Sequence, residues 1–365
     1  MEVSIPLDCV GVAGSTRISS VAVQDGSPRP LTEKLLERPR VVEQIRSLIP
    51  DRRRSHLVPY NTTPLERDLA LALGIPMYGA DPRLFPLGTK SGCRRIFAEE
   101  GVRHPAGFED LHSLGEVGGR PGQAAGGQPW GWPGPGQAQR GRLRRRQRLV
   151  DLGGLPPPGS AGEPEALRER ARAMRFELPE MPFDGYAAKL AERGGIVEEL
   201  ISGVELRSPS VQLRVTPLGE VELLSTHDQL LGGPSGQSYL GCRFPADFAY
   251  AKAISADAAT IGRRLAREGV LGRFAIDFVV VRDAAGSWTP YAIELNLRKG
   301  GTTHPFLTLQ FLTDGRYNPA TALFVTPDGR EKHLVATDHL EDPLLRGLRH
   351  DDLFDIVARH GLHFD

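Results

Sequence analysis

Polar and apolar residues alternate from 292 to 298, which predicts a β-strand with one face toward a core. The other face would carry the side chains of Glu294, Asn296 and Arg298. A carboxylate, an amide and a guanidinium gathered at one spot cost free energy unless something binds there. Oxygen ligands beside a fixed cation suit Mg²⁺ carrying a phosphate. The strand therefore predicts a combined metal and phosphate site.

A second strand is predicted over residues 273–281, where Asp277 stands alone among apolar neighbours. A hairpin centred between Ala285 and Gly286 would place Asp277 directly opposite Glu294. Like charges in that position repel each other, so the pair predicts a cation between them. The alternative is a protonated or solvated carboxylate pair on an open sheet face.

Helical periodicity marks several other segments. A capping box is predicted at Thr63 and Glu66, with Pro64 at the first helical position and Gly74 after the last. The predicted helices cover 31–49 with a break at Pro39, 64–73, 88–101, 163–178, 183–195, 247–269 and a segment near the end of the chain.

The remaining segments predict strands and loops. Residues 75–79 and 196–206 favour strands, and 211–224 favours a hairpin with Pro217 and Gly219 in its turn. The glycine-rich stretch 226–242 predicts a long loop, long enough to suggest a function.

Composition narrows the class of protein. Lysine plus arginine balance aspartate plus glutamate at 45 each, so no net charge favours nucleic acid or membrane. The three cysteines are far apart and lack metal-ligand spacing, which indicates a reducing compartment. No long apolar run and no secretory signal are present in the sequence, so we expect a cytoplasmic enzyme without a membrane partner.

The string ELNLRKGGTTHP, preceded by Asp277 on the neighbouring strand, resembles the metal end of the ATP-grasp superfamily and its pheganomycin-type peptide ligase branch. That resemblance implies a mixed α+β and α/β ATP-grasp fold with an N-terminal α/β lead-in. It also implies an ATP- and Mg²⁺-dependent ligase that joins a carboxylate to an amine through an acyl-phosphate. The substrates would be small molecules or peptides, and their identity and the oligomeric state stay open.

The resemblance also implies roles for individual residues. Three would hold Mg²⁺: Asp277, Glu294 and Asn296. Arg298 would neutralise charge at the reacting phosphate, with Lys90 and the weaker candidate Lys299 on the other phosphates. The nucleotide hinge would be lined by Glu198, Glu199 and Glu205. A surface lysine at Lys90, exposed strand-edge charges at the glutamates and a structural role for His304 are the alternatives.

Three regions are expected on this basis. Residues 1–88 would form the lead-in, 89–200 the small subdomain with a disruption at 118–148, and 201–365 the large subdomain with the metal site. Because relatives are expected to continue further, the chain is expected to be truncated at its C-terminus.

Residues 118–148 differ from the rest of the chain, because they lack acids, lysine and β-branched residues. We expect this segment to be irregular and exposed. The basic run 140–148 could contact nucleic acid, although balanced charge makes that partner unlikely, or the segment could be a linker. A third interpretation is a shifted reading frame.

Back-translation of residues 136–148 with GC-rich codons supports the shifted frame. Read one base later, these codons give Ala-Lys-Leu-Asn-Glu-Gly-Val-Ser-Gly-Asp-Gly-Asn, a lysine strand and a glycine-rich loop of the kind an ATP-grasp protein places over the phosphates. The chain as written would then lack one phosphate lysine and the phosphate lid. An inactive nucleotide-binding pseudoenzyme is therefore the alternative function.

Overall fold

The structure is a computed structural model of the 365-residue chain. It describes residues 19–113, 116, 194–232, 238–337 and 339–361, scattered positions between 154 and 192, and the strand backbones of 140–144 and 148–151. The chain divides into two compact units. One unit comprises Met1–Pro82 with His339–Asp365, and the other comprises Arg83–Asp338. Residues 1–18 lie outside the described residues.

The first unit is helical in its described part. Its elements are α1 (Leu31–Leu36), α2 (Pro39–Ser47), η3 (Arg52–Arg54), α3 (Pro64–Leu73), η5 (Pro343–Leu345) and α10 (His350–Arg359). The predicted break at Pro39 is confirmed, since α2 begins there. The capping box is also confirmed: Thr63 caps α3, Glu66 returns to the Thr63 backbone, and Gly74 ends the helix at φ +69°.

A small hydrophobic core holds α1, α2 and α3 together. Leu35, Val42, Leu69 and Leu73 form it from three helices. The strand expected at 75–79 is reduced to a single parallel bridge between Leu57 and Met77. A short extended segment with one bridge gains little from a sheet, so the expectation of a full strand there is wrong.

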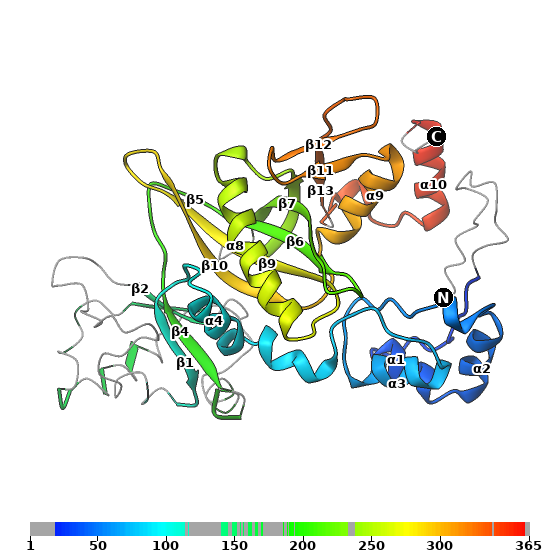
Figure 1. The fold of residues 1–365 in the computed structure, drawn as a ribbon, viewed down its shortest axis with the longest axis horizontal. Helices are drawn as coiled ribbons and strands as arrows, with labels where there is room; N and C mark the ends of the chain where they lie inside the picture. Colours follow the sequence, from blue (N-terminus) through cyan, green and yellow to red (C-terminus); the bar gives the residue numbers. More distant parts are fainter. Residues whose placement is uncertain are drawn as a thin grey trace. The chain divides into compact units, whose positions relative to one another are not determined.

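The second unit contains the larger sheet (Figure 1). Within its described residues the strand order is β10–β9–β6–β7–β8–β13, with β5 pairing with β9 as a seventh strand, and every pairing is antiparallel. The strands are β5 (Glu205–Arg207), β6 (Pro209–Val215), β7 (Val221–Gly232), β8 (Ser238–Phe244), β9 (Gly272–Arg282), β10 (Trp288–Asn296) and β13 (Leu334–Ala336).

Helix α8 (Phe248–Arg267) packs against one face of this sheet, and Figure 1 shows it running across β6 and β9. Ile254, Ile261 and Leu265 on its apolar face are fully buried. The amphipathic pattern of this segment therefore predicted the helix and its buried face correctly.

The glycine-rich stretch 226–242 forms strands over 226–232 and 238–242, which corrects the prediction of a loop there, and 233–237 lie outside the described residues. Most of it belongs to β7 and β8, which pair from Asp228 with Arg243 to Gly232 with Ser238. Glycine content lowered the apparent strand propensity, but pairing on both sides of β7 and β8 supplies the hydrogen bonds that decide the conformation. The predicted hairpin at 211–224 is confirmed, with Gly219 at φ +81° in its turn.

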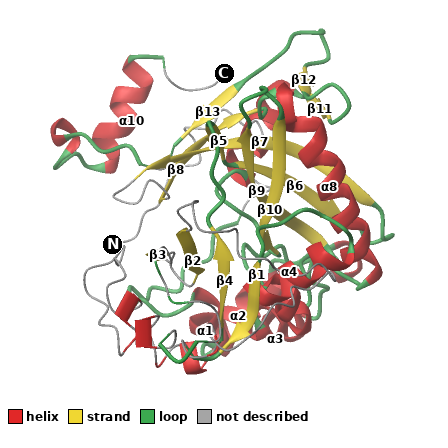
Figure 2. Ribbon diagram, turned by 90° about the vertical axis from the view of Figure 1, so that its left-hand side faces the viewer, coloured by secondary structure: helices red, strands yellow, loops and turns green. Residues whose placement is uncertain are grey.

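A smaller antiparallel sheet has the order β1–β4–β2–β3. Its strands are β1 (Gly107–Leu111), β2 (Arg140–Arg144), β3 (Arg148–Asp151) and β4 (Gly195–Glu199), shown beside α4 (Lys90–Glu99) in Figure 2. The 3₁₀ helix η4 (Pro82–Gly88) precedes α4 in the chain. The helix expected at 88–101 is confirmed, with Thr89 as its cap.

Strand β2 corrects the expectation that residues 118–148 are irregular throughout. Its backbone pairs with β4 from Gly141 opposite Glu199 to Arg144 opposite Ile196. Any non-proline backbone can pair with the open edge of a neighbouring strand, so composition alone did not exclude a strand here. Residues 118–139 and 145–147 lie outside the described residues, as do most of the helices predicted at 163–178 and 183–195.

The remaining elements are α9 (Thr303–Thr313), β11 (Arg316–Asn318) and β12 (Leu323–Val325). Phe306 of α9 and Phe324 of β12 pack against Phe244 of β8 in an aromatic core. Across the described parts of the chain, no helix combines the length and the apolar character needed to cross a membrane.

Candidate functional site: an acidic pair beside a nucleotide-sized cavity

Asp277 of β9 pairs directly with Glu294 of β10, as predicted. The hairpin itself is centred on Ala285, because Arg282 pairs with Trp288, so the predicted centre is wrong by half a residue. A shift in register between Ala292 and Glu294 restores the expected pairing. This bulge at Ile293 decides which side chain faces Asp277, since bulges re-aim the residues that follow them.

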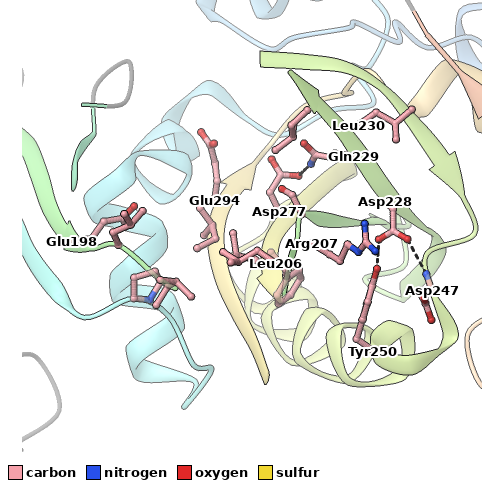
Figure 3. Close-up of a pocket in the computed structure, with 18 of the residues that line it drawn as sticks. Glu198, Leu206, Arg207, Asp228, Gln229, Leu230, Asp247, Tyr250, Asp277 and Glu294 are labelled. Atoms are coloured by element: carbon pink, nitrogen blue, oxygen red, sulfur yellow. Dashed lines mark hydrogen bonds between the residues drawn. The ribbon is translucent and has the colours of Figure 1, made fainter. Parts of the chain in front are cut away.

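Both oxygens of Asp277 accept hydrogen bonds from amide groups. Asn296 Nδ2 donates to Oδ2 at 3.0 Å, and Gln229 Nε2 donates to Oδ1 at 2.9 Å. Burial and the facing Glu294 raise the pKa of Asp277 to about 6. Two carboxylates and two amides therefore converge on one sheet face, and Figure 3 shows Asp277 and Gln229 pointing toward each other.

Lys90 completes this cluster from α4. Its Nζ lies 2.7 Å from Glu294 Oε1, and both side chains are about one-third exposed or less. Lys90 is the first residue of α4, behind the cap formed when Thr89 Oγ1 accepts from Gly92 N. The sequence therefore predicted the helix terminus correctly, and the structure places this lysine at the acidic pair.

Two cations, Arg298 and Lys299, follow β10 in the chain. Arg298 is exposed and donates to the carbonyl oxygen of Lys299 at 3.0 Å. Its charge acts to lower the pKa of Asp277, against the larger effects of burial and Glu294. Burial and the neighbouring Arg273 lower the pKa of Lys299. Arg298 is thus near the acidic pair, and within the described contacts neither side chain hydrogen-bonds to Asp277 or Glu294.

The hinge glutamates separate into two environments. Glu198 is buried at 2% exposure, and Arg94 Nη1 lies 3.4 Å from its Oε2. Glu199 is exposed, and its Oε1 accepts from the backbone nitrogen of Ala106 at 3.0 Å. Glu198 therefore takes part in a buried ion pair, whereas the Glu199 side chain faces solvent and fixes the segment that leads into β1.

Glu205 and His304 have no described contact with the acidic pair. Glu205 forms ion pairs with Arg207 at 2.5 Å and Arg282 at 3.1 Å, an exposed cluster at the β5–β9 pairing. Glu205 is not among the residues that line the cavity described next. His304 is exposed near the start of α9.

A cavity of about 740 Å³ joins the acidic pair to the hinge. Its lining includes Asp277, Glu294 and Gln229 at one part and the run 198–201 at another. Asp228, Asp247 and Tyr250 line it as well, with Tyr250 Oη donating to Asp228 at 2.7 Å (Figure 3). This volume falls in the range of small-ligand and cofactor sites.

The donor set fits a hard cation. Asp277 and Glu294 supply carboxylate oxygens. Because Asn296 donates through its nitrogen, its carbonyl oxygen is left for another partner. Oxygen ligands of this kind suit Mg²⁺. No cluster of three or more His, Cys, Asp or Glu side chains suited to a metal occurs in the described residues, so the amide oxygens matter here.

The sequence missed three residues of this region. Asp228 and Gln229 fall in the stretch predicted as a loop, because the run Thr-His-Asp-Gln-Leu-Leu at 226–231 shows no alternation typical of a strand, yet both lie in β7. Arg94 is buried, with only 3% of its surface exposed, whereas the sequence indicated only that it belongs to a helix. A buried arginine needs carboxylate partners, but its partners Glu109 and Glu198 come from distant strands, so no local pattern could identify them.

A family model described as IQCH-like, ATP-grasp matches residues 164–320. The chain is 29% identical over 353 residues to an L-propargylglycine–L-glutamate ligase of Streptantibioticus cattleyicolor, covering 95% of this chain and 68% of the ligase. It is 26% identical over 345 residues to IQ motif-containing protein H of Danio rerio, covering 84% of this chain and 32% of that protein.

Among solved structures, an L-amino acid ligase from Bacillus licheniformis aligns with a TM-score of 0.44 and 19% identity, covering 79% of this chain and 59% of the ligase. The family match and the ligase relative confirm the predicted resemblance to ATP-grasp proteins and their peptide-ligase branch. The chain has the predicted ATP-grasp fold. The shifted reading frame at 118–148 stays a prediction.

Proposed function

We propose that this protein is an ATP- and Mg²⁺-dependent ligase that joins a carboxylate to an amine. The observation that carries the proposal is the pairing of Asp277 with Glu294, with Asn296 donating to Asp277, at the wall of a nucleotide-sized cavity. The similarity to a ligase acting on L-propargylglycine and L-glutamate supports the same reaction class. We expect the protein to work in the cytoplasm.

The residues of the acidic pair would hold the metal. Asp277, Glu294 and the carbonyl oxygen of Asn296 are the proposed ligands. Mg²⁺ bound there would neutralise charge on the nucleotide phosphates. Lys90 and Arg298, both near this pair, would add positive charge on the phosphate side, and Lys299 is a weaker candidate.

The hinge would hold the nucleotide base. The backbone of 198–201 lines the cavity, and Glu199 carries an exposed carboxylate at that point. Arg94 keeps Glu198 paired inside the protein, so Glu198 would act through the backbone position of the hinge. Glu205 lies farther along the chain in its own ion-pair cluster, so its nucleotide role is the least supported of the three.

The proposed chemistry has two transfers. A substrate carboxylate oxygen attacks the γ-phosphorus of ATP, ADP leaves, and an acyl-phosphate forms. The amine nitrogen then attacks the acyl carbon, phosphate leaves, and the nitrogen loses a proton. The protein would contribute position and charge stabilisation rather than a covalent nucleophile. We propose amino acids or small peptides as the substrate class.

The test is product formation. The purified protein would be incubated with ATP, Mg²⁺ and pooled amino acids, with ADP, phosphate and new dipeptide masses as readouts. The same assay would be run on a version with the shifted frame restored, because the written chain would lack a phosphate lysine. We expect dipeptides from the protein with the restored frame. The protein with the sequence as given should turn over ATP weakly or not at all.

A matched pair of variants locates the activity. Made in the frame-restored protein, Glu294→Gln removes one charge at nearly constant shape and should abolish Mg²⁺-dependent turnover. Glu220→Gln makes the same change at an exposed residue of the β6–β7 turn and should leave turnover unchanged. Full activity of Glu294→Gln would show that this carboxylate does not hold the metal.

A further inference from the structure

Gln229 reaches Asp277 from a strand that does not pair with β9. Strand β6 lies between β9 and β7, and its Ser210 pairs with Asp277 on one side and His227 on the other. The Gln229 side chain spans this strand, and its Nε2 lies 2.9 Å from Asp277 Oδ1. A contact across an intervening strand requires an extended, directed side chain, so it fixes the position of both groups.

The chemistry of the contact sets the orientation of the amide. A carboxylate oxygen accepts but cannot donate, so the amide nitrogen must face Asp277 and the Gln229 carbonyl oxygen must face away. The same logic applies to Asn296, whose Nδ2 meets the other oxygen of Asp277 at 3.0 Å. Asp277 is thus held from two sides by two amides, one from β10 and one from β7.

We propose that Gln229 is a positioning residue for the cation site, acting through Asp277. This inference rests on the proposed function, because it assigns Asp277 to the metal. Asp277 faces the like charge of Glu294, and repulsion would turn a free carboxylate away from the site. Donors on both oxygens hold its plane fixed, so the two carboxylates stay aimed at one point.

The magnitude of such an effect is known in general terms. Partners that orient a metal-binding side chain change metal affinity by about tenfold or more when removed. Gln229 also lines the cavity beside Glu294, so its loss would act at the site and not at a distant part of the fold.

The experiment measures Mn²⁺ binding to the full chain by electron paramagnetic resonance, with Mn²⁺ as a spectroscopic replacement for Mg²⁺. Gln229→Met keeps the length of the side chain but cannot donate, and it should weaken Mn²⁺ binding about tenfold. Gln212→Met is the matched control. Gln212 is a buried amide of β6 that accepts from Thr303 Oγ1 at 3.3 Å, and its replacement should change the Mn²⁺ affinity by less than about twofold.

A double-mutant cycle separates positioning from a general disturbance of the sheet. If Gln229 acts through Asp277, then Gln229→Met should cause no further loss in an Asp277→Asn background. An equal loss in both backgrounds, or equal affinities of Gln229→Met and Gln212→Met, would overturn the inference. Should Asp277→Asn bind too weakly to measure, the comparison of those two single variants decides.

Two further variants distinguish the inference from the proposed function. Asp277→Asn and Glu294→Gln should each weaken Mn²⁺ binding strongly. If neither does, the metal site of the proposed function is wrong, and the inference fails with it. If both weaken binding while Gln229→Met does not, only the inference fails.

Discussion

Lys90 and Glu294 form an ion pair with Nζ 2.7 Å from Oε1. The pair joins the first turn of α4 to the end of β10, and it places a protein cation on a proposed metal ligand. A lysine ion-paired to Oε1 offsets part of the negative charge that would otherwise attract a divalent cation. We therefore expect Lys90 to weaken the binding of a free metal ion at Glu294. We expect it to strengthen the binding of a metal ion that is bound to a nucleotide, because Lys90 can also contact the phosphates.

Replacing Lys90 by Met should have opposite effects on two ligands. Bare Mn²⁺ should bind about three- to fivefold tighter, because a partly exposed ion pair worth under about 1 kcal/mol no longer competes. Mn²⁺ with a nucleotide should bind more weakly, because the phosphates lose a charged donor. Electron paramagnetic resonance titrations with and without a non-hydrolysable ATP analogue measure both affinities.

Lys299→Met is the control for this prediction, since it removes a positive charge five residues after Glu294 that forms no described ion pair with Glu294. It should not strengthen binding of bare Mn²⁺. A Lys90→Met protein that binds both ligands more weakly would contradict the competition between Lys90 and the cation.

Glu198 should contribute to the stability of the fold, whereas Glu199 should not. Glu198→Gln weakens the buried ion pair between Glu198 and Arg94 and should lower the free energy of unfolding by about 1–3 kcal/mol. Glu199→Gln changes an exposed side chain and should stay within about 0.5 kcal/mol. Urea denaturation measures both changes. Equal stabilities would show that the buried ion pair has no structural role.

The same two variants can be compared for nucleotide binding. We expect Glu199→Gln to weaken binding of a fluorescent ADP analogue, because this carboxylate lines the cavity from an exposed position. Glu198→Gln should affect binding less at temperatures where the variant is fully folded. The reverse order would assign the nucleotide contact to Glu198.

The sequence predicted elements whose determinants are local. Thr63, Pro64, Glu66 and Gly74 define α3 within twelve residues of one another, and the structure reproduces each role. The pairing of Asp277 with Glu294 was also predictable, because one short turn connects the two strands. The exact register of the hairpin was not predictable, because the bulge at Ile293 lies within β10 and depends on how that strand packs, not on the turn.

Contacts between distant segments were beyond the reach of the sequence. Gln229 meets Asp277 across β6, and Arg94 meets Glu198 from another element more than 100 positions earlier in the chain. The loop prediction for 226–232 and 238–242 is wrong because glycines suggested a loop where pairing with neighbouring strands forms β7 and β8. Strand β2 was missed for a similar reason, since the edge of β4 supplied partners that composition does not reveal.

His227 should make the protein sensitive to acid. Its side chain is fully buried, and burial lowers its pKa from the usual 6.5 to about 3. The ring packs against Phe244, and Nε2 meets Ser225 Oγ at 2.8 Å, whereas Nδ1 has no hydrogen-bond partner among the described residues. Below pH 6.5 the unfolded chain takes up a proton that the folded protein does not.

Stability should therefore be highest above pH 6.5 and fall as the pH drops toward 3. Between pH 7.5 and pH 5 this one group should cost about 2 kcal/mol of unfolding free energy. His227→Phe should remove that part of the loss, as measured by urea denaturation at the two pH values. His304→Gln, at an exposed histidine, should not. Identical pH dependence in wild type and His227→Phe would show that this ring is not a source of acid sensitivity.

Restoring the shifted frame across 118–148 should increase nucleotide affinity. The written segment contains no lysine, whereas the shifted frame supplies Ala-Lys-Leu-Asn-Glu-Gly-Val-Ser-Gly-Asp-Gly-Asn over 136–147. A lysine and glycine amides would add several donors to the phosphates, and each charge-assisted hydrogen bond contributes about 1.5–3 kcal/mol. Binding of a fluorescent ATP analogue in Mg²⁺ should therefore tighten by at least about tenfold.

The control for this prediction changes the restored lysine to methionine while keeping the glycine-rich run, and it should lose most of the gain. Sequencing the gene across codons 115–150 tests the origin of the segment independently of binding. If the written chain binds Mg-ATP as tightly as the restored version, the segment does not replace a phosphate-binding loop. Strand β2 already shows that 140–144 can pair with β4, so backbone pairing alone cannot distinguish the two frames. The difference in affinity for Mg-ATP can distinguish the two frames, because they offer the phosphates different side chains and a different number of flexible backbone amides.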